Sequence, residues 1–281
     1  MAATSSVETP FGKSARDENF PVGSWLLSAK LRPHVAIFYA YARAIDDIAD
    51  NPKLASEDKI ERLENFARAI SGTETKDPAY GKAHRMRESL GETNIASVHC
   101  TDLIDAFKQD ATKLRYQSWQ ELMHYCSRSA SPVGRYLLDL HGESRAGYAE
   151  SDALCNALQV LNHLQDCKAD YLHLNRVYLP EMWLQEVGSS VEALADPAAS
   201  HSLRQVIDYC LDGVEELLVS ARKLPALLGN RFLAMESAVI VVIAERLTQE
   251  LRRRDPLAER VVLSRPAYAF CFLKGVIRVL L

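Results

Sequence analysis

The sequence predicts an all-α protein with one large domain, and three observations support this. Apolar residues recur three and four positions apart, the period of a helix, over long windows of the 281-residue chain. No stretch alternates strictly between apolar and polar residues, and no Asn-Gly pair marks a hairpin turn. Glycine (12 residues) and proline (11 residues) are sparse and fall between the periodic segments. A chain of this length can bury a sizeable core.

The helices can be placed from their start and stop signals. Pro33 suits the first turn of a helix that runs to about Asp50. Ser56 is predicted to cap the next helix, which has an acidic first turn and ends near Gly72. The stretch 172–197 is predicted to be a loop with short helical turns. Further helices are expected at 78–90, 94–114, 118–130, 132–141, 151–173, 198–228, 230–254 and 266–280.

The composition indicates a domain boundary, a cellular compartment and a class of partner that is excluded. We expect residues 1–17 to form a flexible tail and residues 18–281 to form the helical domain. The N-terminal residues lack the layout of a signal peptide, and the six cysteines contain no CxxC pair, so we expect reduced thiols in the cytoplasm. The net charge of −4, without a basic stripe, argues against a nucleic-acid partner.

The C-terminal segment 266–280 is the most apolar of the predicted helices. It is too short to span a membrane, and Lys274 and Arg278 interrupt it. We interpret it as a helix that closes the core. The alternative is an interfacial helix that makes a peripheral contact with the inner membrane.

Residues 43–50, RAIDDIAD, place an arginine and three aspartates in an apolar segment. Asp46 and Asp50 are four residues apart and share one helix face, and Asp47 lies about 100° round from Asp46. At ~6 Å and an effective dielectric of about 20, each pair of carboxylates costs on the order of 2–3 kcal/mol. We therefore expect a cation to be shared among them.

A second polar stripe lies about 120 residues further along the chain. Asn162, Asp166 and Asp170 are spaced by four residues, and Gln159 lies one turn before them. Oxygen ligands suit Mg²⁺ or Mn²⁺ rather than Zn²⁺. Each helix offers too few ligands for a closed cage, so we expect several Mg²⁺ ions that bridge a phosphorylated substrate.

Two alternatives remain open for these acidic stripes. An acidic pair at this spacing is, by itself, more often a solvated helix face. His163 and Cys167, also four residues apart, could instead bind zinc, but no further His or Cys pair supports a zinc site.

These segments resemble the squalene/phytoene synthase family of head-to-head isoprenoid synthases. YARAIDDIAD (41–50) is similar to that family's first aspartate-rich motif, and ALQVLNHLQDCKADYLHLNRVYLP (157–180) is similar to its second. YCSRSASPVGRYL (125–137) is similar to a further family helix. The resemblance covers about residues 18–260, and it is greatest to the branch that makes hydroxysqualene in bacterial hopanoid pathways.

The resemblance implies an isoprenoid-synthase fold with a central cavity, and a role for particular residues. The residues implied to bind magnesium are Asp46, Asp47, Asp50, Asn162, Asp166 and Asp170. Those implied to act in catalysis near the diphosphate or the reacting carbons are Arg43, Tyr125 and Tyr178. Those implied to contact substrate are Phe20, Ser24, Tyr41, Gln159, Gln165 and Arg176.

Two positions depart from the family pattern. Gln165 stands where the family has arginine, which removes a positive charge near the diphosphate, and Ser131-Pro132 replaces an Ala-Gly pair. These changes fit an enzyme that starts from a ready-made intermediate. The expected reaction is presqualene diphosphate plus water giving hydroxysqualene and diphosphate, with Mg²⁺ and without NADPH.

The sequence is also compatible with two other functions. The chain could be a squalene or phytoene synthase that condenses two prenyl diphosphates, or a non-catalytic scaffold that binds prenyl diphosphate. The expected pathway neighbours are a presqualene diphosphate synthase and a hydroxysqualene reductase.

Overall fold

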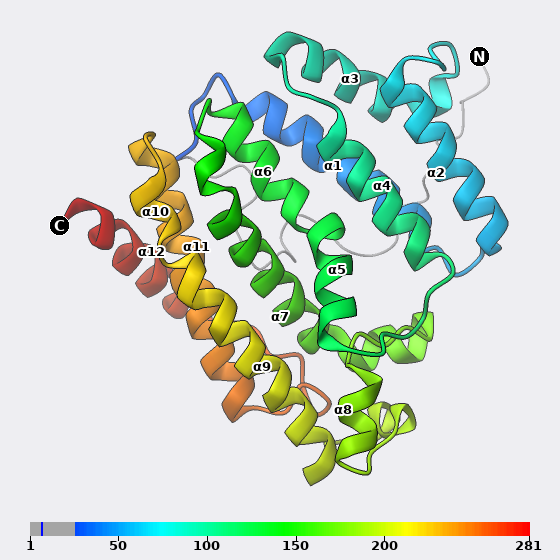
Figure 1. The fold of residues 1–281 in the computed structure, drawn as a ribbon, viewed down its shortest axis with the longest axis vertical. Helices are drawn as coiled ribbons and strands as arrows, with labels where there is room; N and C mark the ends of the chain where they lie inside the picture. Colours follow the sequence, from blue (N-terminus) through cyan, green and yellow to red (C-terminus); the bar gives the residue numbers. More distant parts are fainter. Residues whose placement is uncertain (1–6, 8–25) are drawn as a thin grey trace.

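The structure is a computed structural model that describes residue 7 and residues 26–281 (Figure 1). Every helix or strand element assigned in these residues is a helix, which confirms the predicted all-α class. Phe20 and Ser24, predicted to contact substrate, lie outside the described residues, as does the predicted boundary between residues 17 and 18.

The chain forms long helices joined by short connections. The N-terminal half contains α1 (Arg32–Ala49), α2 (Ser56–Ser71), α3 (Gly81–Thr93), α4 (Val98–Asp110), α5 (Trp119–Ser129) and α6 (Ser131–Leu140). The C-terminal half contains α7 (Tyr148–Leu174), α8 (Glu181–Glu186), α9 (His201–Ala221), α10 (Leu224–Leu227), α11 (Arg231–Arg253) and α12 (Arg265–Leu280). Short 3₁₀ turns occur at Pro78–Tyr80, Arg145–Gly147 and Val191–Ala195.

Three expected helix boundaries were wrong. Ala55, not Ser56, is the N-cap of α2, and the Ser56 hydroxyl instead donates to the carbonyl of Ala111 at 2.7 Å. The helix expected at 94–114 is shorter, because its first residue, Asn94, takes a left-handed conformation (φ 54°) that ends α3. The helix expected at 198–228 is interrupted between α9 and α10, where Pro225 lacks an amide hydrogen for a continuous helix.

Two hydrophobic clusters form the core and lie on either side of a cavity. One cluster contains side chains of α1, α2, α3, α4 and α6. In it, Phe38 of α1 stacks on Tyr136 of α6 with ring centroids 4.0 Å apart. The other joins α5 and α7 with the later helices, and α7 runs through the middle of the molecule (Figure 1). α12 lies close against α11, because a Cβ on Gly275 would come within 2.5 Å of the Val239 Cα.

Candidate active site

A cavity of about 310 Å³ lies where the two clusters meet. Its walls come mainly from α1, α5, α6, α7, α10 and α11, together with the end of α4. The expectation of a central cavity between helices is therefore confirmed.

The cavity has an apolar end and a charged end. Lining residues change along α1 from Val35 and Phe38 to Asp46 and Asp50, and they change along α7 in the same way. The polar ends of the two helices meet across the cavity, where Arg176, just after α7, donates to Asp50 at 2.8 Å. α10 and the start of α11 belong to the apolar end, where Leu224 and Leu228 lie near Gly147 at the start of α7.

Arginine side chains neutralise the first acidic stripe. Arg43 donates to Asp46 at 2.8 Å and to Asp47 at 2.7 Å. Burial alone would lower the pKa of Arg43, but the charges of Asp46 and Asp47 outweigh it and raise that pKa. The repulsion predicted from the sequence neglected these guanidinium groups. Asp46 and Asp50 line the cavity, whereas Asp47 is buried beside Arg43 and does not.

The second stripe also faces the cavity, with one exception. Gln159, Asn162 and Asp170 line the cavity, as predicted for one face of α7. The fourth member of the stripe, Asp166, is buried and accepts a hydrogen bond from Arg260 Nε at 2.9 Å. Arg260 follows α11 and itself lines the cavity.

Gln165 does not occupy the position that the sequence suggested. Its side chain is buried and donates to the carbonyl of Val261 at 2.5 Å, so it holds the segment that carries Arg260 rather than facing substrate. The cavity therefore has a guanidinium group beside Asp166 despite the glutamine at position 165.

Tyr41 likewise lies away from the cavity. The residue is wholly buried among α1, α2 and α4, and its hydroxyl donates to the Cys100 carbonyl at 3.1 Å. Its ring packs against Phe66, with centroids 6.1 Å apart. The structure gives Tyr41 a role in the core, because its polar group is already satisfied there.

Asp110, the last residue of α4, forms a buried polar network at the charged end. It accepts a hydrogen bond from the Tyr125 hydroxyl at 2.6 Å, and its main-chain carbonyl accepts one from Arg176 at 3.0 Å. Burial raises the pKa of Asp110 to about 6, although the Arg176 charge opposes this shift. Burial also raises the pKa values of Tyr125 and Tyr178 above the usual phenol value.

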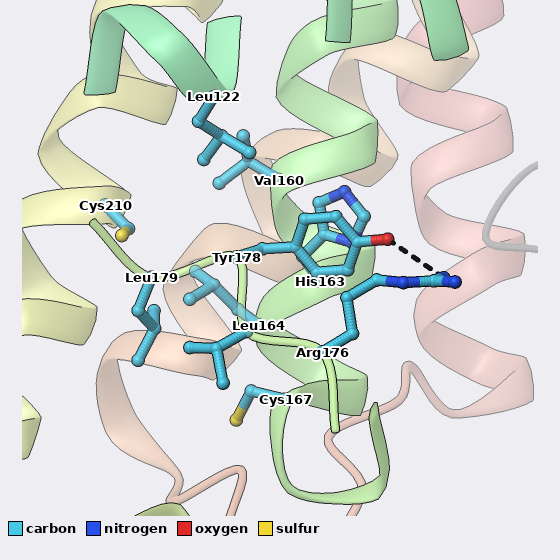
Figure 2. A pocket seen from close by; sticks show the side chains of 10 residues that line it. Leu122, Val160, His163, Leu164, Cys167, Arg176, Tyr178, Leu179 and Cys210 are labelled. Atoms are coloured by element: carbon cyan, nitrogen blue, oxygen red, sulfur yellow. Dashed lines mark hydrogen bonds between the residues drawn. The ribbon is translucent and has the colours of Figure 1, made fainter. Parts of the chain in front are cut away.

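Figure 2 shows side chains that adjoin this network, among them Arg176, Tyr178 and His163. Tyr178 stacks on His163, with ring centroids 3.4 Å apart, and Arg176 donates to the Tyr178 hydroxyl at 3.3 Å. A void of about 10 Å³, room for a single water, lies beside them. His163 is thus packed on an aromatic ring, and Cys167 is buried.

The described residues contain no group of three or more His, Cys, Asp or Glu side chains placed to hold a metal ion by themselves. The donors that line the cavity are nevertheless carboxylate and amide oxygens, the ligand type that Mg²⁺ prefers. Magnesium normally keeps water and takes phosphate oxygens as ligands. The residues therefore fit Mg²⁺ that is bound together with a phosphorylated substrate.

Two residues of this site were missed in the sequence. Asp110 continues the apolar face of Leu103 and Ala106, so an acid on a buried helix face was the available signal. Arg260 lies in an irregular connection, where no periodicity points to it.

Comparison with known proteins places the chain in a family. Residues 14–267 match the family model described as squalene/phytoene synthase, so the chain belongs to the squalene/phytoene synthase family. The prediction of an enzyme of this family is confirmed.

Two individual relatives within the family share a single named activity. The chain is 42% identical to the hydroxysqualene synthase of Rhodopseudomonas palustris, over 93% of this chain and 88% of that protein. It is 41% identical to the hydroxysqualene synthase of Zymomonas mobilis, over 89% and 84% of the two chains.

Solved structures share the fold. The crystal structure of squalene synthase HpnC from Alicyclobacillus acidocaldarius matches with a TM-score of 0.71 and 31% identity, over 83% of this chain and 87% of that one. A dehydrosqualene synthase in complex with ligand matches with a TM-score of 0.79 at 18% identity, over 93% and 91% of the chains, and supports the fold alone.

Proposed function

We propose that the protein converts presqualene diphosphate and water to hydroxysqualene and diphosphate. The observation that carries this proposal is the cavity itself, which joins an apolar end to an end with aspartates from α1 and α7 and three arginines. A prenyl diphosphate has the same division into an apolar chain and a charged head. The similarity to two hydroxysqualene synthases supports the choice of reaction within the family.

The charged end is suited to departure of the diphosphate. Heterolysis of the carbon–oxygen bond leaves a carbocation and places negative charge on the leaving group, which positive groups stabilise. Arg43, Arg176 and Arg260 each pair with an aspartate of the stripes. We infer that these arginines turn to phosphate oxygens when substrate binds.

Magnesium fits this arrangement as a cofactor. Asp46, Asp50, Asn162 and Asp170 face the cavity, and Asp166 would join them when Arg260 moves to the diphosphate. Bound Mg²⁺ would stabilise the charge of the departing diphosphate as a Lewis acid. Asp47 lies behind Asp46 and serves this site by holding Arg43.

The apolar end is suited to the carbocation. Phe38, Tyr39 and Phe107 line the cavity with aliphatic side chains from α6, α7 and α11. Aromatic faces stabilise a cation without a lone pair that would trap it. Water then attacks the carbocation, and no hydride donor is needed.

Isotope labelling tests this function directly. Purified protein with presqualene diphosphate and Mg²⁺ in ¹⁸O-labelled water is expected to give hydroxysqualene that carries the label, at a rate unchanged by NADPH. Squalene formed on addition of NADPH, or consumption of farnesyl diphosphate alone, would establish the alternative of a squalene or phytoene synthase. Binding of diphosphate without turnover of either substrate would establish the scaffold.

We further propose that the enzyme works in the cytoplasm at a membrane surface, between a presqualene diphosphate synthase that supplies its substrate and a hydroxysqualene reductase that consumes its product. None of the described helices is both long and apolar enough to cross a bilayer. α12, however, buries only a narrow face against α11. The side chains exposed on its opposite face include Phe270, Leu273, Ile277 and Leu280.

Charge favours an anionic lipid surface as the partner of α12. The helix contains Arg265, Lys274 and Arg278 and no acidic residue, and Arg278 pairs with Glu245 of α11 at 3.2 Å. Burial of Phe270 and Leu273 in lipid would contribute about 1.5–3 kcal/mol each. The double substitution Phe270→Ser and Leu273→Ser is therefore expected to weaken binding to anionic phospholipid vesicles at least about tenfold in co-sedimentation.

The matched control is Val98→Ser, which removes an exposed apolar side chain on α4. It is expected to leave vesicle binding unchanged. Equal binding of the α12 variant and wild type would contradict the membrane contact, and a dimer in solution that the α12 variant abolishes would assign the face to self-association.

A further inference from the structure

The buried carboxyl group of Asp110 lines the cavity at its charged end, but diphosphate departure as proposed above gives it no role. The residue is 3% exposed and lies at the junction of α4, α5 and the segment after α7. One carboxyl oxygen accepts the Tyr125 hydroxyl at 2.6 Å, and the other lies 3.9 Å from Arg176 Nε. A carboxyl group in such surroundings is costly to ionise, which is typical of groups that exchange protons.

Tyr125 is placed to connect Asp110 with the contents of the cavity. Both residues line the cavity, and the Tyr125 phenol is fully buried between α5 and the Tyr178 ring, with centroids 5.6 Å apart. The Tyr178 hydroxyl donates to the other carboxyl oxygen of Asp110 at 3.5 Å, so the carboxyl group is held between the two phenols.

The proposed reaction requires a proton acceptor beside the attacking water, apart from the released diphosphate. Attack of water on a carbocation gives a protonated alcohol, and the product forms only when that oxygen loses a proton. The cavity-facing aspartates of α1 and α7 would be bound to Mg²⁺ and near diphosphate, which leaves them weakly basic.

We propose that Asp110 accepts this proton through Tyr125, and that the pair thereby directs the carbocation to hydroxysqualene. The inference rests on the proposed function. A lone pair of water forms the new carbon–oxygen bond. The resulting oxonium passes a proton to the phenol oxygen of Tyr125 while the phenol passes its own proton to Asp110 Oδ2. Asp110 ends neutral and releases the proton to solvent after the product leaves.

Among the described residues, one other buried carboxyl group lines the cavity, and it is the rival acceptor. Glu236 of α11 is 5% exposed and lies one turn after Leu233, at the apolar end. Asp110 is favoured because it lies beside Arg176, which contacts Asp50 at the end where the diphosphate leaves. The carbocation forms beside that leaving group.

The acceptor must be ionised, which gives the reaction a pH dependence. Burial raises the pKa of Asp110 to about 6, so the carboxylate is present above this pH and is lost as the pH falls through it. The titratable or charged groups that act on Asp110 from the elements around it are Asp50, Lys59, Tyr116, Tyr125, Cys126, Arg176 and Tyr178.

Product analysis separates a proton acceptor from a structural residue. Without an acceptor for the oxonium proton, water capture reverses, and the carbocation instead loses a proton from carbon to the released diphosphate, which gives a hydrocarbon. Asp110→Asn keeps a hydrogen-bond acceptor for Tyr125, and it is expected to lower the ratio of hydroxysqualene to hydrocarbon at least about tenfold. Diphosphate release should continue.

Tyr125→Phe is expected to lower the ratio by a similar factor, and the double variant should be no worse than either single one, because both act in one relay. In wild type the ratio should fall below about pH 6, and in Asp110→Asn it should not change there. Asp105→Asn, on the exposed face of the same helix, is the control and should behave as wild type.

Three results would overturn the proposal. An unchanged product ratio in a folded Asp110→Asn variant would exclude Asp110 as the acceptor. A shift to hydrocarbon in Glu236→Gln but not in Asp110→Asn would assign the role to Glu236. Equal loss of diphosphate release and of hydroxysqualene would make Asp110 structural. Wild-type protein that makes no hydroxysqualene would instead refute the proposed function.

Discussion

Replacing Asp46 with asparagine is expected to lower the rate of diphosphate release from presqualene diphosphate by at least about 10². Asp170→Asn, on the facing helix, should have a similar effect. Each side chain lines the charged end of the cavity, and each variant keeps the shape of the residue while it removes a negative charge that a metal ion needs. Steady-state assays of released diphosphate measure the effect.

The double variant distinguishes one shared site from two separate ones. If both aspartates hold a single cluster of Mg²⁺ and diphosphate, the combined loss should be well short of the product of the two single losses. Asp105→Asn, with its side chain 61% exposed on α4, should keep full activity. Independent, multiplicative losses would contradict the shared site.

Thermal unfolding supplies a readout that does not depend on turnover. Mg²⁺ and diphosphate together should raise the Tm of wild type by more than the sum of their separate shifts, because each completes the binding site of the other. Asp46→Asn should lose most of this excess. A merely additive shift in wild type would contradict a cluster bridged by the diphosphate.

Helical periodicity was sufficient to predict the fold class and about half of the residues of the site. The spacing of Asp46 and Asp50, and of Asn162 and Asp170, places each pair on one face of a long helix, and the structure turns both faces into one cavity. Such patterns are local, since a helix face follows from residue spacing alone.

The partners of those residues could not be predicted in this way. Arg260 binds Asp166 although the two residues are 94 positions apart in the sequence. Gln165 binds the carbonyl of Val261 rather than facing substrate. Tyr41 lies five residues before Asp46 on the same helix, but its side chain packs in the core. These contacts depend on how helices pack and on irregular connections, for which the sequence contains no period.

Replacing Arg176 with methionine is expected to destabilise the protein by about 3–5 kcal/mol. Arg176 is 5% exposed and contacts Asp50 at 2.8 Å and Asp110 at 3.9 Å. Methionine fills similar space, but it leaves the Asp110 carboxylate buried without the positive charge that opposes its raised pKa. Denaturant unfolding at pH 7.5 measures the change in free energy.

The pH dependence of this loss identifies its origin. The pKa of Asp110 is about 6 in the folded protein and lower when unfolded, so burial of the carboxylate costs stability above about pH 6, and that cost falls as the pH drops toward 4. Without Arg176 the folded pKa rises further. The difference between Arg176→Met and wild type should therefore shrink as the pH falls.

Two further variants test the assignment to Asp110. Adding Asp110→Asn to Arg176→Met should recover a large part of the lost stability at pH 7.5, because it removes the unpaired buried charge. Arg135→Met breaks a pair with Asp152 in which both side chains are partly exposed, and it should cost no more than about 1 kcal/mol. If Asp110→Asn brings no recovery, the loss in Arg176→Met comes from packing or from Asp50, and the buried charge of Asp110 is not its cause.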